Sequence, residues 1–295
     1  MQPYTGFASV YDVFMDNVPY EEWTDYVVHL LKKYGVEQGI VLELGCGTGS
    51  MTSRLSARGY DMIGIDSSEE MLSIAREKSS GKEDILYLCQ DMRNFELYGT
   101  VAAVVSVCDS MNYILTEEDL LEVFRLVNNY LDPRGIFIFD LDTEYAYEEV
   151  IGDATIAENR EEGSFIWENT YYKEEMINEI NLSLFLPAGE EVPVTEETGG
   201  QFSQRRKASD PQKPRYFIKQ EETHYRRAYS IDTIRRLLEE AGMEWVAVYD
   251  SLTEERPQED TERVYIVARE KRQKNKLYTT GGYNGRLYRK SKRGK

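Results

Sequence analysis

Three glycines at alternate positions, Gly45, Gly47 and Gly49, follow an apolar run in the stretch IVLELGCGTGS (residues 40–50). Glycine tolerates positive φ and lets a ligand approach the backbone closely. A helix that begins just after such a turn offers unpaired N–H groups to a carboxylate or phosphate. The pattern predicts a nucleotide-like ligand; a tight strand-to-helix turn without a ligand accounts less well for three glycines behind an apolar strand.

The spacing argues against two phosphate-binding motifs. The dinucleotide fingerprint G-x-G-x-x-G needs a third glycine where Ser50 stands, and no G-K-[ST] of a P-loop follows. Asp66 lies about twenty residues past the loop, where nucleotide-binding sheets contact ribose, and a carboxylate can accept two hydrogen bonds from a diol. Its alternative role, capping the next helix, is better filled by Ser67 or Ser68.

The elements that must position these residues alternate regularly. Residues 19–35 predict a first helix, with Pro19 in the first turn and Gly35 as the stop. Apolar segments separated by amphipathic ones predict a parallel sheet covered by helices on both faces. The expected strands are 40–45, 60–66, 85–91, 101–109 and 135–142, and the expected helices between them are 50–59, 67–81 and 116–135.

The pattern changes after residue 150. Residues 164–189 are rich in aromatic and branched side chains and predict a β-hairpin, and residues 216–230 predict another strand. The polar segment between them predicts a mobile loop near 187–215. A helix at 230–242 and two antiparallel strands at 243–251 and 263–270 close the pattern. We therefore expect a core of residues 1–150 and 230–270 and a β-rich insert, 151–229, above the carboxyl ends of the strands, where open α/β sheets bind ligands.

Four segments in order, ELGCGTGS, GIDSSEEML, CQDMRNF and VCDSMNYI, resemble the class I S-adenosylmethionine-dependent methyltransferases. The resemblance covers residues 40–142 closely and extends more loosely to Ala268. It is to the small bacterial type, with an N-terminal Tyr-Asp helix and an antiparallel insert after the fifth strand. It implies an α/β fold with a Rossmann-like seven-stranded sheet, mostly parallel with the last strand antiparallel, helices on both faces and a small antiparallel β insert.

The resemblance also implies a cofactor site. The three glycines would wrap the methionine part of S-adenosylmethionine, Glu43 would organise contacts with its amino group, and Asp66 would accept both ribose hydroxyls. Asp91 and the backbone N–H of Met92 would bind adenine. The remaining residues that we expect in this site are Cys46, Thr48, Ser67, Met71, Asp109 and Ser110, the last two facing the sulfonium and the acceptor. For Met71, core packing is an equal alternative.

The segment FASVYDVFMD (residues 7–16) resembles the opening of many small bacterial members, in which a Tyr-Asp helix folds over the cofactor. Tyr11 would then donate its hydroxyl to the cofactor carboxylate. Phe7, Tyr11 and Phe14 also have the spacing of a packing stripe on a helix, and this alternative stays open.

Methyl transfer from a sulfonium needs in-line positioning and, for some acceptors, a base, but no metal. Three residues are candidates on the acceptor side. His224 is a potential general base or a surface histidine. Asn112 would orient an acceptor or cap a turn, and Arg226 would hold an acidic substrate or point into solvent.

Composition narrows the functional class. The net charge of −18 disfavours polyanionic partners, so we expect a small-molecule acceptor without nucleic acid or membrane. The [DN]-P-P-[YF] motif of enzymes that methylate amino groups of nucleic-acid bases is absent at the fourth strand. This absence argues against adenine N6 or cytosine N4 as the acceptor. The chain has three cysteines without CxxC spacing and no secretory signal, which predicts a cytoplasmic protein. The sequence is compatible with either a monomer or a homodimer.

Residues 271–295 contain ten Lys or Arg and no Asp or Glu. The segment predicts a solvated, disordered tail, an RNA-contacting arm, or an arm that folds back on the acidic body. Two alternative functions follow: methylation of RNA or protein with the tail as recruitment arm, and a non-catalytic cofactor-binding module.

Overall fold

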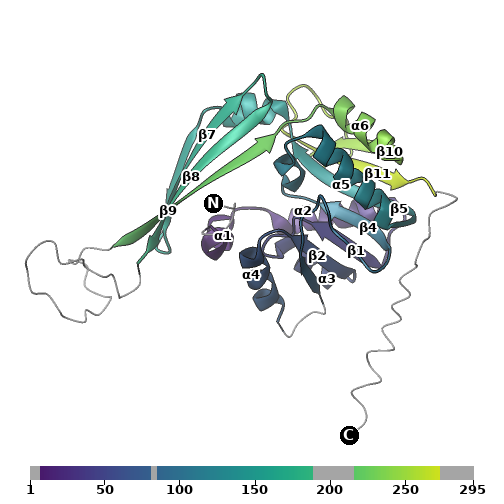
Figure 1. Ribbon diagram of the computed structural model, residues 1–295, viewed down its shortest axis with the longest axis horizontal. Coiled ribbons are helices and arrows are strands. Elements are labelled where there is room, and N and C mark those ends of the chain that lie inside the picture. The colour runs from purple at the N-terminus through teal and green to yellow at the C-terminus, as the bar shows by residue number, and fades with distance from the viewer. Residues whose placement is uncertain (1–6, 81–84, 189–215, 273–295) are drawn as a thin grey trace, which may run out of the picture.

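The computed structural model describes residues 7–80, 85–188 and 216–272 of the chain, so most of the predicted loop near 187–215 and of the predicted tail lies outside these ranges. The strands form two sheets, one of seven and one of four. Figure 1 shows β7, β8 and β9 rising to one side of the larger sheet, with α1 beneath them. The insert therefore lies next to the core.

The seven-stranded sheet has the order β10-β11-β5-β4-β1-β2-β3. The pairs among β1 to β5 are parallel, whereas the last strand in the chain runs antiparallel to both of its neighbours. The prediction of a mostly parallel sheet whose last strand is antiparallel is therefore confirmed. The strands are β1 (Ile40–Leu44), β2 (Asp61–Asp66), β3 (Leu86–Cys89), β4 (Val101–Ser106), β5 (Leu131–Asp142), β10 (Met243–Asp250) and β11 (Arg263–Glu270).

Three of the helices in the described residues begin at a side chain that caps them. Ser68, Thr116 and Ser230 each accept a hydrogen bond from the backbone N–H three residues on, which satisfies one unpaired N–H group of the helix. Ser68, and not Ser67, is thus the cap after the second strand. The helices are α1 (Ala8–Phe14), α2 (Tyr20–Lys33), α3 (Ser50–Ala57), α4 (Glu69–Ser79), α5 (Glu117–Tyr130) and α6 (Ile231–Glu240), with a 3₁₀ turn η1 (Ser110–Tyr113).

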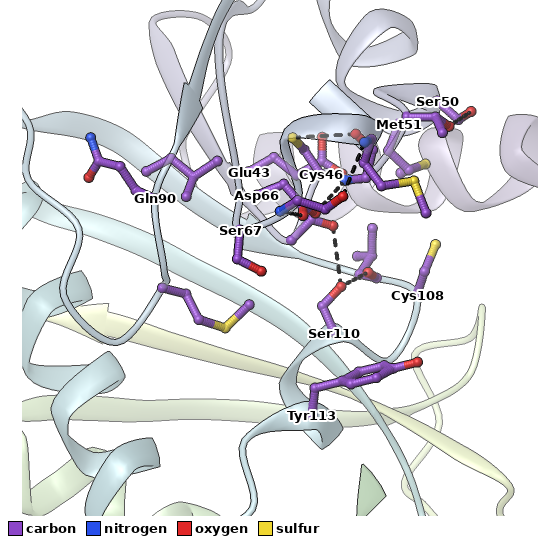
Figure 2. Close-up of a pocket in the computed structure, with 18 of the residues that line it drawn as sticks. Glu43, Cys46, Ser50, Met51, Asp66, Ser67, Gln90, Cys108, Ser110 and Tyr113 are labelled. Carbon is purple, nitrogen blue, oxygen red and sulfur yellow. Dashed lines mark hydrogen bonds between the residues drawn. The ribbon is translucent and has the colours of Figure 1, made fainter. Parts of the chain in front are cut away.

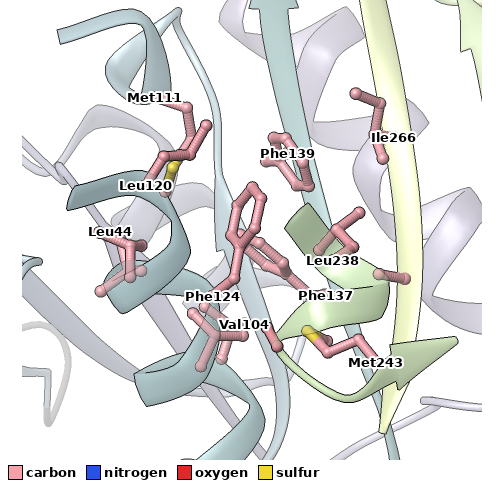
Figure 3. Close-up of a cluster of buried hydrophobic side chains, with 14 of the residues drawn as sticks. Leu44, Val104, Met111, Leu120, Phe124, Phe137, Phe139, Leu238, Met243 and Ile266 are labelled. Carbon is pink, nitrogen blue, oxygen red and sulfur yellow. The ribbon is translucent and has the colours of Figure 1, made fainter. Parts of the chain in front are cut away.

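Both faces of the large sheet are covered. On one face, α5 and α6 pack against the sheet, and Phe124 of α5 lies against Phe137 and Phe139 of β5, with ring centroids 5.9 and 5.5 Å away (Figure 3). On the opposite face, α2 and α3 bury Leu30, Leu55 and their neighbours. Burial on both sides explains why these strands read as continuous apolar runs.

The smaller sheet has the order β6-β7-β8-β9, and all its pairs are antiparallel. The predicted hairpin is present, with its turn at residues 173–176. The chain also forms two elements, η2 and β6, that we did not predict from the sequence. A single π-helical turn such as η2 and a short, mostly exposed edge strand such as β6 give little signal in the sequence. The bounds are η2 (Ala146–Ile151), β6 (Thr155–Asn159), β7 (Ser164–Tyr172), β8 (Ile177–Pro187) and β9 (Phe217–Arg227).

Asn112 joins the two sheets. Its side-chain amide is fully buried and donates to the carbonyls of Asp142 on β5 and Arg227 on β9, at 3.1 and 2.9 Å. Its oxygen accepts from the Asp142 N–H at 3.0 Å. Asn112 therefore ties the end of β9 to the end of β5, and its side chain is not available to orient an acceptor.

We expect Asn112→Ala to lower the free energy of unfolding by about 2–4 kcal/mol, because it leaves three buried backbone groups without partners. Urea denaturation would measure the loss. Asn181→Ala, on the exposed face of β8, is the matched control and should cost about 0.5 kcal/mol or less. Equal losses in the two variants would contradict the linking role of Asn112.

Candidate functional site

A cavity of about 430 Å³ lies across the carboxyl ends of β3, β2, β1 and β4, which are neighbours in that order (Figure 2). Its size is within the range of small-molecule sites. Most residues of the predicted cofactor site line it. The predicted residues on its wall are Tyr11, Glu43, Gly45, Cys46, Gly47, Thr48, Asp66, Ser67, Met71, Asp91, Met92 and Ser110.

The three glycines of the loop meet different surroundings. Gly45 has a φ of +71°, and a Cβ there would lie 2.6 Å from the Ser110 Oγ. Gly47, at +51°, lines the cavity, and a Cβ there would meet no atom within 4 Å. Gly49 is not on the wall of the cavity: a Cβ there would lie 2.5 Å from the Tyr87 hydroxyl. Gly47 therefore leaves room for a ligand, whereas the lack of a side chain at Gly49 allows α3 to approach β3, and the predicted contact of Gly49 with the cofactor stays a prediction.

Asp66 ends β2 at the middle of the cavity. Its carboxylate accepts the N–H of Gly47 at 2.8 Å and that of Ser68 at 2.9 Å, which fixes its orientation. Burial raises the pKa of Asp66 above its ordinary value, although these backbone N–H groups oppose the shift. A carboxylate that is held this way still has acceptor sites for a diol.

Glu43 lies on β1 beneath the loop and is almost completely buried. Burial raises its pKa to about 8, even though the Thr52 hydroxyl donates to the carboxylate and opposes the shift. Glu43 also lines the cavity, so a ligand with an ammonium group would favour its ionised form.

The β3 end of the cavity carries an ion pair. Arg93 donates to Asp91 through Nε at 3.0 Å and through Nη2 at 2.5 Å, and it holds the pKa of that carboxyl below its ordinary value. Both residues line the cavity beside Met92 and Gln90. The sequence did not point us to Arg93, although its spacing two residues after Asp91 is the signal that would have done so.

The β4 end is formed by a strained turn. Cys108 and Asp109 have φ values of +62° and +55°, which are uncommon for residues other than glycine. Both backbone N–H groups donate to the buried carboxylate of Asp140, at 3.0 and 2.8 Å. This turn directs Cys108, Ser110 and Tyr113 into the cavity.

Asp109 is not on the cavity wall, contrary to its predicted position. Its carboxylate lies 2.7 Å from Nη1 of Arg226 and 3.4 Å from Nη2 of Arg263. Arg263 also contacts Asp140 and Asp142, at 3.1 and 2.8 Å. Burial raises the pKa of Asp140 to about 7 in spite of Arg263. This cluster of three carboxylates and two guanidinium groups lies just behind the cavity.

Arg226 is thus engaged within the protein and does not point into solvent. Besides Asp109, it contacts the Tyr113 hydroxyl at 3.2 Å and lies over the Tyr113 ring at 5.1 Å. His224 is also buried, with Nδ1 3.3 Å from the same hydroxyl. Neither residue lines the cavity; Tyr113, which does, stands between them and the cavity. We did not single out Tyr113 from the sequence, although it is the aromatic residue of the motif VCDSMNYI that follows the fourth strand.

Helix α1 closes one side of the cavity. Tyr11 lines it, while Phe7 and Phe14 pack in a cluster with Phe165, Leu182 and Leu184 of the insert. Asp12 accepts from the Thr48 hydroxyl at 2.6 Å and from Lys78 Nζ at 2.8 Å. The helix is therefore both a packing stripe and a cover, because its apolar side contacts the insert and its polar side contacts the glycine loop.

Comparison with known proteins identifies the family. A model described as a methyltransferase domain matches residues 41–135. The putative methyltransferase YqeM of Bacillus subtilis (strain 168) is 34% identical over 266 residues, which are 90% of this chain and 96% of that protein. The chain belongs to the class I S-adenosylmethionine-dependent methyltransferases.

Two further relatives extend this result. The crystal structure of an S-adenosylmethionine-dependent methyltransferase from Clostridium acetobutylicum ATCC 824 matches with a TM-score of 0.73 and 25% identity, over 91% of this chain and 99% of that one. A dTDP-3-amino-3,4,6-trideoxy-alpha-D-glucopyranose N,N-dimethyltransferase of Streptomyces venezuelae is 29% identical over 135 residues, 45% of this chain and 56% of that protein. The first covers both sheets, and the second covers less than half of the chain.

Residues 7–80, 85–188 and 216–272 contain no group of three or more His, Cys, Asp or Glu side chains arranged to hold a metal ion. Within the same ranges, no helix has the length and apolar character needed to cross a membrane.

The contacts of Asp12 predict a role in retaining the cofactor. Asp12→Ala should increase the dissociation rate of S-adenosylmethionine about 3- to 10-fold, because α1 loses its polar contacts with the glycine loop. Stopped-flow displacement would measure the rate. Asp25→Ala on α2 removes an exposed carboxylate away from the cavity and serves as the control; a rate for Asp12→Ala equal to that of the control would exclude this role.

The pKa of Glu43 predicts a pH dependence of stability. The folded protein keeps the Glu43 carboxyl protonated at pH values at which the unfolded chain has released this proton. The free energy of unfolding should therefore fall as the pH rises from about 4.5 to about 8, by up to about 1.4 kcal/mol per pH unit. Glu43→Gln should show a shallower fall in urea denaturation over this range, whereas the exposed control Glu37→Gln should follow the wild type. Parallel curves for wild type and Glu43→Gln would show that burial does not raise the pKa of Glu43.

Proposed function

We propose that this protein transfers a methyl group from S-adenosylmethionine to a small-molecule acceptor. The observation that carries the proposal is the arrangement of polar groups along one cavity. Asp91 lies at the end of β3, Asp66 at the end of β2, the glycine loop after β1, and Ser110 and Tyr113 after β4. The order of these groups along the cavity matches the order of adenine, ribose and amino-acid tail along S-adenosylmethionine. The acceptor would then lie at the β4 end.

The residues present fit the cofactor. Asp66 would accept the two ribose hydroxyls, since its orientation is already fixed by two backbone N–H groups. Glu43 would carry the negative charge opposite the ammonium group, and the open side of Gly47 would receive the methionine part. Asp91 and Met92 would bind adenine, with Ser67 and Met71 beside them. When bound, S-adenosylmethionine supplies a methyl group that is already activated by the sulfonium charge.

Two observations support a small acceptor. The cavity of about 430 Å³, bounded by Tyr11 of α1 and Tyr113 of η1, has the size of a small-molecule site. The chain carries a net charge of −18, which opposes the approach of a polyanion. The name of the Streptomyces venezuelae relative, an N,N-dimethyltransferase of a nucleotide-linked amino sugar, is consistent with such an acceptor.

Calorimetric titration with S-adenosylmethionine tests the proposal. The wild type should bind, and Asp66→Ala should weaken binding about 10- to 100-fold, because two charge-assisted hydrogen bonds to the ribose are lost. Asp61→Ala, at the exposed start of the same strand, should bind like the wild type. No binding by the wild type, or equal binding by Asp66→Ala, would overturn the assignment of the site. Release of S-adenosylhomocysteine from pools of small metabolites would then identify the acceptor.

A further inference from the structure

Three side chains form a line that leads away from the cavity. Tyr113 is on the cavity wall, and its hydroxyl lies 3.3 Å from Nδ1 of His224. Nε2 of His224 lies 3.2 Å from Oε2 of Glu222, and these two side chains are only 3% and 1% exposed. A phenol, an imidazole and a carboxylate thus lie in hydrogen-bond contact from the cavity into the interior.

With Glu222 ionised, the contacts favour one arrangement of protons. An ionised carboxylate only accepts hydrogen bonds, so Nε2 of His224 donates to Glu222 and Nδ1 is left as an acceptor. The Tyr113 hydroxyl then donates to Nδ1. The other oxygen of Glu222 accepts the backbone N–H of Phe7 at 3.2 Å, which fixes the carboxylate from the side of α1. Proton movement from Tyr113 to His224 requires no rearrangement of this line.

The Tyr113 oxygen also faces a cation. Nη2 of Arg226 lies 3.2 Å from it, and Arg226 is held in turn by Asp109. A guanidinium donor stabilises negative charge on a phenol oxygen. The Tyr113 oxygen is therefore placed to release its proton to His224 and to accept another from the cavity side.

We propose that Tyr113 is the catalytic residue that accepts the proton of the acceptor, and that His224 and Glu222 are the positioning residues that take up the charge behind it. This inference rests on the proposed function. An amine or hydroxyl acceptor forms a bond to the methyl carbon as the bond from that carbon to sulfur breaks, with its electron pair going to sulfur. The acceptor's proton passes to the Tyr113 oxygen, and the phenol proton passes to Nδ1 of His224. The positive charge of the sulfonium is thereby replaced by that of an imidazolium paired with Glu222.

This arrangement makes a prediction that requires no acceptor. S-adenosylmethionine carries a sulfonium charge that S-adenosylhomocysteine lacks, and a nearby cation disfavours the protonated imidazole. Among the residues that the structure describes, charged or titratable groups that face His224 include Glu222 and Arg226 on β9, Tyr113 on η1 and, through Arg226, Asp109 after β4. All of these are the same in both complexes, so a difference between the two complexes reports the sulfonium charge.

The chain contains only two histidines, which makes nuclear magnetic resonance of ¹⁵N-histidine-labelled protein a direct test. We expect the Nε2–H tautomer for His224. We also expect its titration midpoint to be lower with S-adenosylmethionine than with S-adenosylhomocysteine, by about 0.5 to 1 pH unit. His29, which is exposed and pairs with Glu254 at 2.6 Å, is an internal control whose midpoint should be the same in both complexes.

Binding provides a second readout. Ligand binding and protonation of His224 are linked, so each must affect the other equally. The ratio of the affinity for S-adenosylmethionine to that for S-adenosylhomocysteine should therefore be about 3- to 10-fold higher above the His224 midpoint than below it. Tyr113→Phe keeps the ring and should still bind both ligands, but it removes the phenol from Nδ1 and should therefore move the ¹⁵N resonance of Nδ1 of His224. His224→Gln should abolish the pH dependence of the affinity ratio, while His29→Gln should preserve it.

The outcomes separate this inference from the proposed function. If the wild type binds neither ligand, the proposed function fails. If it binds both and His224 has the Nδ1–H tautomer, or its midpoint is the same in both complexes, the proton path is overturned and the proposed function stands. An Nδ1 resonance of His224 that is unchanged in Tyr113→Phe would exclude Tyr113 from the path.

Discussion

The site depends on a buried group of charges at the carboxyl ends of β4 and β5. Three carboxylates, from Asp109, Asp140 and Asp142, face the guanidinium groups of Arg226 and Arg263. Buried charges are tolerated only with partners, and removal of one partner is strongly destabilising. Since Arg226 belongs to the insert and Arg263 to the last strand of the core, this requirement fixes the insert against the core. It also holds the turn that presents Tyr113 to the cavity.

The core of the fold and the cofactor end of the site could be predicted because local signals control them. Continuous apolar runs identified the parallel strands, and Ser68, Thr116 and Ser230 marked helix starts through hydrogen bonds made within one turn. Asp66 and Gly47 face the cavity because they follow parallel strands whose ends share one edge of the sheet. Their position in space thus follows from their position in the sequence.

The acceptor end could not be predicted in the same way, because contacts between distant segments determine it. Whether Arg226 points into solvent or toward the core depends on Asp109, which is more than a hundred residues away. Asn112 and Tyr113 are neighbours in the same motif after the fourth strand, yet one side chain links two strands and the other lines the cavity. Gly49 looks equivalent to Gly47 in the sequence, and only the position of Tyr87 shows that it serves helix packing.

The two cysteines of the cavity wall bear on how the protein would tolerate its own methyl donor. A sulfonium methyl group reacts readily with thiolates, and both Cys46 and Cys108 line the cavity. Burial is the largest cause that raises the pKa of each thiol well above its ordinary value, and nearby carboxylates add to it. Both side chains therefore remain neutral thiols at physiological pH. The same burial would thus limit the alkylation of these two thiols by a bound methyl donor.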